Sequence, residues 1–186
     1  MSIKSNFESL TESIIKQSEK FNFNLNQLPS INDYKTDIRE DKYFKEIFSE
    51  LNKKEFNCLY WFDCESVEVA EKLNKHMDSK RKELKANNRV VPATNNNLNS
   101  KTMYVGIRRG GKRKYDGLTY ISGRIIQHLG YYAKGSTQGL QLIHWVEERD
   151  LNIELNMVEF RELPNEYLNI VEKLVAYKLK PLCGKH

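Results

Sequence analysis

The chain has 186 residues and a formal net charge of +5, with 30% charged and 39% hydrophobic residues. This balance excludes a largely disordered chain and predicts one medium-sized domain, or a core with a small appendage. No apolar run is long enough to span a membrane, and the first residues lack the apolar core of a signal peptide. The three cysteines are an odd number and have no zinc-ligand spacing, so we expect buried free thiols in a reducing cytoplasm.

Positive charge is concentrated in one part of the sequence. Residues 101–135 contain eight Lys or Arg residues and one acid, Asp116, which gives this segment a charge of +7 and leaves −2 for the rest. A basic patch on a nearly neutral body is typical of a protein that binds a polyanion such as nucleic acid. A solvated loop without a ligand is the alternative interpretation.

Residues 1–54 are predicted to form a helical extension. Ser5 and Glu8 have the spacing of a capping box, and apolar residues then recur at helical steps as far as Phe21. The Asn-rich segment 22–36 predicts a loop, and a second apolar stripe predicts a helix ending near Leu51. Simple packing against the core is the expected role of this extension.

The remaining residues, 55–186, are predicted to form the main domain. We expect, in order, strand 56–63, a helix capped by Ser66, loop 86–101, strand 102–107, helices 121–133 and 137–148, strand 151–160 and helix 165–179. The strands are aromatic-rich or alternate between apolar and polar residues, and the helices repeat apolar residues every three or four positions. The predicted fold class is therefore α/β (α+β), with a small central antiparallel sheet flanked by helices.

The stretch from Thr102 to Gly130 carries the clearest chemical pattern. It starts as a strand with Tyr104, passes through a glycine-rich basic loop, and continues as a helix carrying Arg124 and His128. Four residues apart on a helix, these two side chains lie on one face, one turn apart. A phenol, a cationic loop and an Arg/His pair together predict a site that binds and polarises a phosphate.

The order of motifs along the chain resembles the GIY-YIG nuclease family. Cys58-Leu59-Tyr60 takes the place of the first family motif and Tyr104-Val105-Gly106 that of the second, followed by Arg124, by Glu172 and by a closing Lys180-Pro181. A His one turn after the arginine is similar to the restriction-endonuclease branch. The resemblance covers about residues 56–184, and 43 residues separate the two tyrosines, where the family usually has a short hairpin.

The resemblance implies a metal-dependent DNA endonuclease with five catalytic residues. Glu172 would hold Mg²⁺ (or Mn²⁺), and Arg124 would stabilise charge on the transferring phosphate. Tyr60 would orient or deprotonate the attacking water, with its pKa lowered by nearby cations, while Tyr104 would contact the water or the phosphate. His128 would orient a tyrosine or the phosphate, or share the proton.

The expected partner is double-stranded DNA, with a homodimer as a further hypothesis because both strands must be cut. The basic loop would contact the phosphate backbone through Arg108, Arg109, Lys112, Arg113 and Lys114. No membrane partner is expected.

Several alternatives stay open at this stage. In a second register, Tyr104 would belong to the first motif and Tyr120-Ile121 to the second. Each candidate residue also has an ordinary structural role open to it, such as strand packing or a surface ion pair. A repair, homing or structure-specific nuclease and a non-catalytic nucleic-acid-binding module are the alternative functions, and which tyrosine is the base is undetermined.

Overall fold

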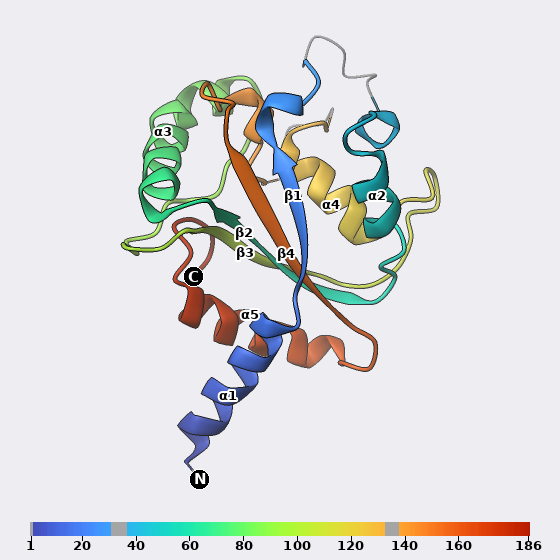
Figure 1. The fold of residues 1–186 in the computed structure, drawn as a ribbon, viewed down its shortest axis with the longest axis vertical. Helices are drawn as coiled ribbons and strands as arrows, with labels where there is room; N and C mark the ends of the chain where they lie inside the picture. Colours follow the sequence, from blue (N-terminus) through green and yellow to red (C-terminus); the bar gives the residue numbers. More distant parts are fainter. Residues whose placement is uncertain (1, 31–36, 133–137) are drawn as a thin grey trace.

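A computed structural model describes residues 2–30, 37–132 and 138–186. Its centre is a four-stranded antiparallel sheet in the order β1-β4-β2-β3 (Figure 1). The strands are β1 (Glu19–Asn24), β2 (Asn57–Cys64), β3 (Thr102–Arg108) and β4 (Asn152–Phe160). The predicted α+β architecture with a central antiparallel sheet is therefore confirmed.

Helices cover both faces of this sheet (Figure 1). They are α1 (Ile3–Lys16), α2 (Lys45–Leu51), α3 (Val67–Ala86), α4 (Tyr120–Leu129) and α5 (Asn165–Leu179), and short 3-10 turns span Leu25–Gln27, Ile38–Glu40 and Leu142–His144. None of the helices in the described residues is long and apolar enough to cross a membrane.

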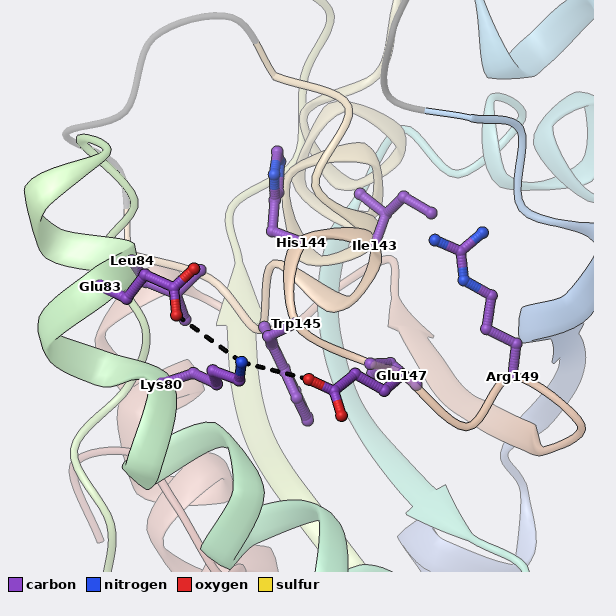
Figure 2. A pocket seen from close by; sticks show the side chains of 9 residues that line it. Lys80, Glu83, Leu84, Ile143, His144, Trp145, Glu147 and Arg149 are labelled. Carbon is purple, nitrogen blue, oxygen red and sulfur yellow. Dashed lines mark ion pairs between the residues drawn. The ribbon is translucent and has the colours of Figure 1, made fainter.

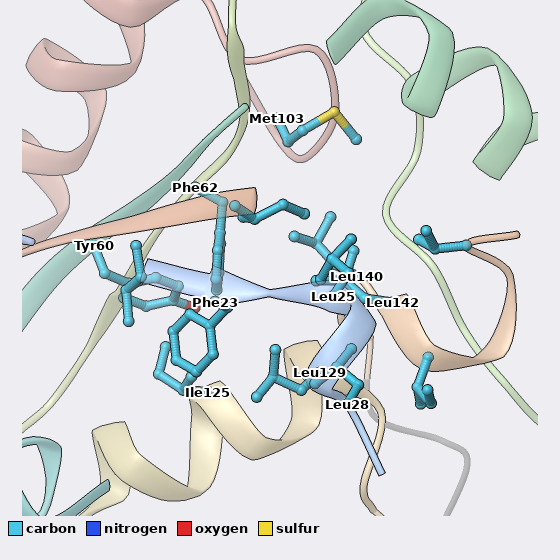
Figure 3. Packing of buried hydrophobic residues seen from close by; sticks show 14 of the residues in the cluster. Phe23, Leu25, Leu28, Tyr60, Phe62, Met103, Ile125, Leu129, Leu140 and Leu142 are labelled. Atoms are coloured by element: carbon cyan, nitrogen blue, oxygen red, sulfur yellow. The ribbon is translucent and has the colours of Figure 1, made fainter. Parts of the chain in front are cut away.

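Alternate side chains of β2 enter two different hydrophobic clusters, as the pleat of a strand requires. Tyr60 and Phe62 lie in the larger cluster with residues of α2, α3 and α4, where Figure 3 shows them near Phe23. Leu59 and Trp61 lie in the smaller cluster with apolar residues of α5. The central strand is thus buried on both faces. All three cysteines are free and buried, which confirms the sequence prediction.

The prediction that residues 1–54 contain helices and a loop but no strand is wrong, because residues 19–24 form β1. Residues 31–36 of the predicted loop 22–36 lie outside the described residues. Strand β1 pairs with β4 along its whole length, with Phe21 opposite Leu155 and Phe23 opposite Ile153. Phe21 and Phe23 alternate with polar residues, a two-residue period that the helical interpretation overlooked. Phe23 and the α2 residues also share the larger core cluster with the rest of the chain. Whether residues 1–54 form a separate unit stays a prediction.

The predicted helix over 137–148 is also wrong for the residues that the structure describes; Thr137 lies outside them. Only Leu142–His144 form a 3-10 turn, and Gln141 before it has a left-handed backbone with φ +57°. The spacing of Leu140 and Ile143 fits a single tight turn as well as a helix, which explains the error.

The segment 121–133 contains helix α4, which ends at Leu129, earlier than predicted. Gly130 follows with φ +103°, the left-handed conformation that commonly ends a helix. The last helix matches its predicted bounds, and Lys180 ends it in a left-handed conformation before Pro181. The strands predicted at 56–63, 102–107 and 151–160 lie within one residue of β2, β3 and β4.

Candidate active site

The two tyrosines of the predicted motifs lie on neighbouring strands. β2 pairs with β3 so that Tyr60 is opposite Gly106 and Phe62 opposite Tyr104, although α3 and a long loop separate the two strands in sequence. The ring centroids of Tyr60 and Tyr104 are 6.2 Å apart. The long connection therefore does not prevent the pairing expected of a short hairpin.

Gly106 makes the approach of the two rings possible. A Cβ atom at this position would lie 2.7 Å from the Tyr104 ring and 2.8 Å from the Tyr60 hydroxyl oxygen. Both distances are too short for any side chain, so only glycine fits between the two phenols without moving one of them.

Arg124 donates hydrogen bonds to the hydroxyl oxygens of both tyrosines. Its Nε donates to Tyr60 Oη at 3.0 Å, and its Nη2 donates to Tyr104 Oη at 3.3 Å. Its Nη1 donates to the Gln127 side chain at 3.2 Å and to the Gln138 carbonyl at 2.6 Å. Helix α4 carries the arginine, and the start of this helix is stabilised by Thr119, whose Oγ1 accepts from Ser122 N.

These bonds use most of the guanidinium's hydrogen-bonding capacity. A guanidinium has five N–H donors, and contacts within the described residues occupy Nε, both N–H groups of Nη1 and one N–H of Nη2. Among the described residues, one N–H of Nη2 is left without a partner. Burial works to lower the pKa of Arg124, but the Tyr60 and Tyr104 phenols raise it above its ordinary value. The group is a fixed positive charge.

His128 completes the cluster, and its protonation state follows from its two partners. The Leu140 backbone N–H, which can only donate, bonds to Nδ1 at 3.2 Å. Nδ1 is therefore the acceptor, and the single proton of a neutral imidazole lies on Nε2. That Nε2 is 3.0 Å from Tyr60 Oη and donates to it. Burial, and after it the charge of Arg124, hold the pKa of His128 well below its usual range, which keeps the ring neutral.

Tyr60 Oη consequently accepts two hydrogen bonds, from Arg124 and from His128. Both acceptor positions of the phenol are used, so its own O–H must point elsewhere. The expectation that nearby cations lower the pKa of Tyr60 is wrong. The side chain is completely buried, and burial raises the pKa, with Tyr104 adding to the rise while Arg124 opposes it.

Tyr104 is the more accessible of the two phenols. It is partly exposed, whereas Tyr60 is 0% exposed. Its oxygen accepts only from Arg124 among the described residues, so its own hydrogen is left to donate. Tyr104 is therefore the phenol that a bound phosphate or water can reach.

Glu172 reaches this region from α5. Its negative charge contributes to the raised pKa of Tyr60, which places it within electrostatic range of the cluster. Within the described part of the chain it forms no hydrogen bond to Tyr60, Tyr104, Arg124 or His128. Its partner is instead His186, whose Nε2 lies 3.5 Å from Oε1 of Glu172. The structure thus brings four of the five predicted residues into one network and sets the fifth beside it.

The basic loop is partly neutralised by its own surroundings. Lys112 pairs with Glu55 at 2.5 Å, and Arg113 pairs with Asp116 at 2.9 Å. The Arg108 guanidinium lies over the Tyr120 ring, 5.5 Å from its centroid. Among the described residues, only Arg109 and Lys114 of the five predicted cations have no such partner.

The second motif register would need Tyr120 in the place of Tyr104. The Tyr120 ring instead lies beside Gly111, where a Cβ atom would be 2.6 Å from it, and under Arg108. Arg124 contacts Tyr60 and Tyr104, which is the arrangement that the first register expects.

Sequence reasoning missed several residues that hold the cluster. Gln127 and the Gln138 carbonyl fix Arg124, and His186 lies against Glu172. Gln127 follows Arg124 by three residues, a helical spacing that was available as a signal. The contacts of the Gln138 carbonyl with Arg124 and of His186 with Glu172 depend on the tertiary structure, and no local sequence pattern predicts them.

A separate cleft of about 330 Å³ lies between α3 and the segment 143–149 (Figure 2). Its Lys80 pairs with Glu147 at 3.1 Å and with Glu83 at 3.7 Å, as the dashed lines of Figure 2 mark. These charges largely satisfy one another. The cleft shares no lining residue with the tyrosine cluster, so it is a separate feature of the surface.

The donor atoms near the cluster fit a magnesium ion that is held by few protein ligands. No group of three or more His, Cys, Asp or Glu residues that could hold a metal occurs in the described residues. Glu172 offers a hard carboxylate oxygen, and Mg²⁺ in phosphate-processing sites is typically held by one or two carboxylates with water and substrate oxygens. The residues present fit that mode and no all-protein cage.

Comparison of the chain with protein-family models, with curated proteins and with solved structures finds no significant match in any of the three. The resemblance to the GIY-YIG nucleases therefore depends on the motif residues.

Proposed function

We propose that this protein is a metal-dependent endonuclease that hydrolyses phosphodiester bonds in DNA. The observation that carries the proposal is the network in which Arg124 bonds to both Tyr60 and Tyr104 while His128 bonds to Tyr60. Three elements separated in sequence, β2, β3 and α4, contribute these side chains. Packing alone does not require a buried guanidinium between two phenols, because the burial of a charge costs desolvation free energy. Buried ionisable groups with strongly shifted pKa values are concentrated at functional sites.

Each residue has a defined role in this proposal. Arg124 presents its charge and its remaining Nη2 N–H to the phosphate, where it stabilises negative charge that develops during attack. Tyr104, the accessible phenol, contacts the attacking water or the phosphate. Tyr60 and His128 are buried, and they hold Arg124 and Tyr104 in place.

Glu172 would hold Mg²⁺ or Mn²⁺, which supplies charge neutralisation and helps to ionise water. Because Tyr60 is buried and has a raised pKa, a phenol acting alone is a poor base at neutral pH. Glu172 on α5, whose charge is felt by Tyr60, is the residue that this proposal assigns to the ion.

Two groups of cations would bind the nucleic acid backbone. Arg109 and Lys114 form the first, in the loop after β3. The second lines a hollow of about 390 Å³ at the end of α5 and consists of Lys173, Lys180 and Lys185. Within the described residues, none of these five cations forms an ion pair, so their charge is open to phosphates.

The proposal is tested by nicking of a supercoiled plasmid with Mg²⁺ and with EDTA. Wild type should nick only with the metal, and Glu172→Ala should lose at least about 100-fold in rate, as expected for a group central to transition-state stabilisation. Equal nicking by wild type and Glu172→Ala would contradict the proposal that Glu172 binds the metal ion. Tight DNA binding without any cleavage would instead support a non-catalytic binding module.

Within the nuclease class we propose a restriction-type enzyme that acts in the cytoplasm on double-stranded DNA, as a homodimer. The Arg124–His128 spacing favours this branch. Discrete fragments from a long defined DNA would support it, whereas a smear or cleavage only at branched structures would favour a repair or structure-specific enzyme, and cleavage at one rare site a homing enzyme.

A further inference from the structure

The segment after α5 is tied to the edge of the sheet. Leu182 N bonds to the Thr102 carbonyl at 2.9 Å, and Cys183 N bonds to the Met103 carbonyl at 3.0 Å. Gly184 N bonds to the Ala93 carbonyl at 2.8 Å. These backbone bonds hold the segment beside β3, which is the strand that carries Tyr104.

Gly184 lets the segment turn towards the site. Its backbone φ of +120° is one that residues with a side chain rarely adopt, and a Cβ atom here would lie 3.4 Å from the Tyr104 ring. The His186 ring follows directly, 4.0 Å from the same Cβ position. The fold thus places an imidazole next to Tyr104 by backbone bonds and a glycine turn.

His186 and Glu172 are both largely buried, with side chains 15% and 19% exposed. Nε2 of the imidazole lies 3.5 Å from Oε1 of the carboxylate. Two neighbouring ligands of one octahedral ion, each about 2.1 Å from it, are about 3 Å apart. A small closure of this pair would let both atoms bind the same ion.

We infer that His186 is a second protein ligand of the ion held by Glu172, and that this pair selects Mn²⁺ or a similar first-row ion over Mg²⁺. The inference rests on the proposed function, because it takes Glu172 as a metal ligand. An imidazole nitrogen is a good ligand for transition ions and a poor one for Mg²⁺, which prefers oxygen. The remaining ligands would come from water and from a phosphate bound by Lys173, Lys180 and Lys185, which line the hollow that His186 borders.

Mn²⁺ provides a direct test, because pulsed EPR detects the nitrogen nucleus of a coordinated imidazole. Wild-type protein with Mn²⁺ and a short random-sequence DNA duplex should show nitrogen modulation of the electron spin echo. His186→Ala should lose that modulation and bind Mn²⁺ at least about tenfold more weakly in an EPR titration of the free ion, since even outer-shell losses cost that much.

Two further variants act as matched controls. His76→Gln changes a histidine that bonds to the Trp145 carbonyl, outside the site, and should leave both the modulation and the affinity unchanged. His186→Asp should restore Mn²⁺ binding through an oxygen ligand, without nitrogen modulation, and should shift the preference towards Mg²⁺.

Two results would overturn the inference: no nitrogen modulation in wild type, or the same modulation in His186→Ala. If Mn²⁺ still binds in a Glu172-dependent way, the proposed nuclease function is unaffected by either result. If Glu172→Ala binds Mn²⁺ as well as wild type does, the metal role of Glu172 and this inference fail together. Absence of plasmid nicking in any metal would count against the nuclease function alone.

Discussion

The Leu140 backbone N–H donates to Nδ1 of His128 at 3.2 Å, and this one bond determines where the imidazole carries its proton. With Nδ1 as acceptor, Nε2 carries the hydrogen and donates to Tyr60. Arg124 donates to the same oxygen. Tyr60 is thus held by two donors in a buried environment, and Arg124 is held in turn by the phenol.

Replacing the two tyrosines should separate stability from activity. Tyr60→Phe leaves the Arg124 Nε–H and the His128 Nε2–H without an acceptor in a buried site, which should cost about 1–3 kcal/mol in the free energy of unfolding. Tyr104→Phe should cost less stability, because its phenol is partly exposed, but should slow nicking by about 10²-fold or more. Urea unfolding and single-turnover nicking measure the two effects. Equal activity losses with unchanged stability would contradict the assignment.

Gly106→Ala should disturb both phenols at once. The added methyl would lie within 3 Å of the Tyr104 ring and of the Tyr60 oxygen, and overpacking of this kind typically costs 1–3 kcal/mol. Gly117→Ala is the control, since nothing lies within 4 Å of its Cβ position and only its φ of +66° opposes the change. Thermal unfolding should show the larger loss for Gly106. A neutral Gly106→Ala would mean that the two rings are not fixed as described.

Stability should fall at mildly acidic pH because of His128. Burial and Arg124 lower the pKa of this histidine in the folded chain, so below an unfolded value of about 6.5 the unfolded state binds the proton more strongly. The stabilisation is complete above about pH 6.5 and is lost progressively as the pH falls towards the folded pKa. His128→Gln should flatten the slope between pH 6.5 and 5 by up to about 1.4 kcal/mol per pH unit.

Urea unfolding at several pH values measures this slope. His144, whose pKa is lowered chiefly by burial, should leave a residual dependence in the variant. If His128→Gln and wild type show the same slope, His128 is not held neutral in the folded chain.

Salt dependence should distinguish the free cations of the basic loop from the paired ones. Arg109→Gln should lower the slope of log affinity against log salt by about 0.9, the value for one phosphate contact on duplex DNA. Lys112→Gln should change it less, because Lys112 already pairs with Glu55. Binding titrations between low and moderate salt measure both slopes. An equal effect of the two changes would mean that the Lys112 ion pair opens when DNA binds.

Much of this architecture follows from local patterns in the sequence. Alternation over residues 151–160 and helical spacing from Leu168 to Leu179 predicted β4 and α5, because single-period patterns reflect which face is buried. The apolar residues around Phe21 fit both a helical period and the two-residue period of a strand. Pairing with β4 in the tertiary structure makes this segment a strand. Leu140 and Ile143 likewise fit both a helix and a 3-10 turn.

The residues of the candidate site could be predicted from the sequence, but the hydrogen bonds between them could not. Motif order selected Tyr60, Tyr104, Arg124, His128 and Glu172, and four of them form one network. The raised pKa of Tyr60 could not be predicted, because it depends on complete burial. The neighbours of Arg124 and Glu172 that come from residues 138 and 186 also depend on tertiary structure.

Arg124→Ala tests the central claim most directly, when single-turnover plasmid cleavage and DNA binding are measured on the same preparation with saturating metal. If Arg124 stabilises the reacting phosphate, the cleavage rate should fall by at least about 10²-fold while binding changes by only a few-fold. A cleavage rate equal to that of wild type, in a variant that is shown to be folded, would contradict the assignment of this network as the catalytic centre.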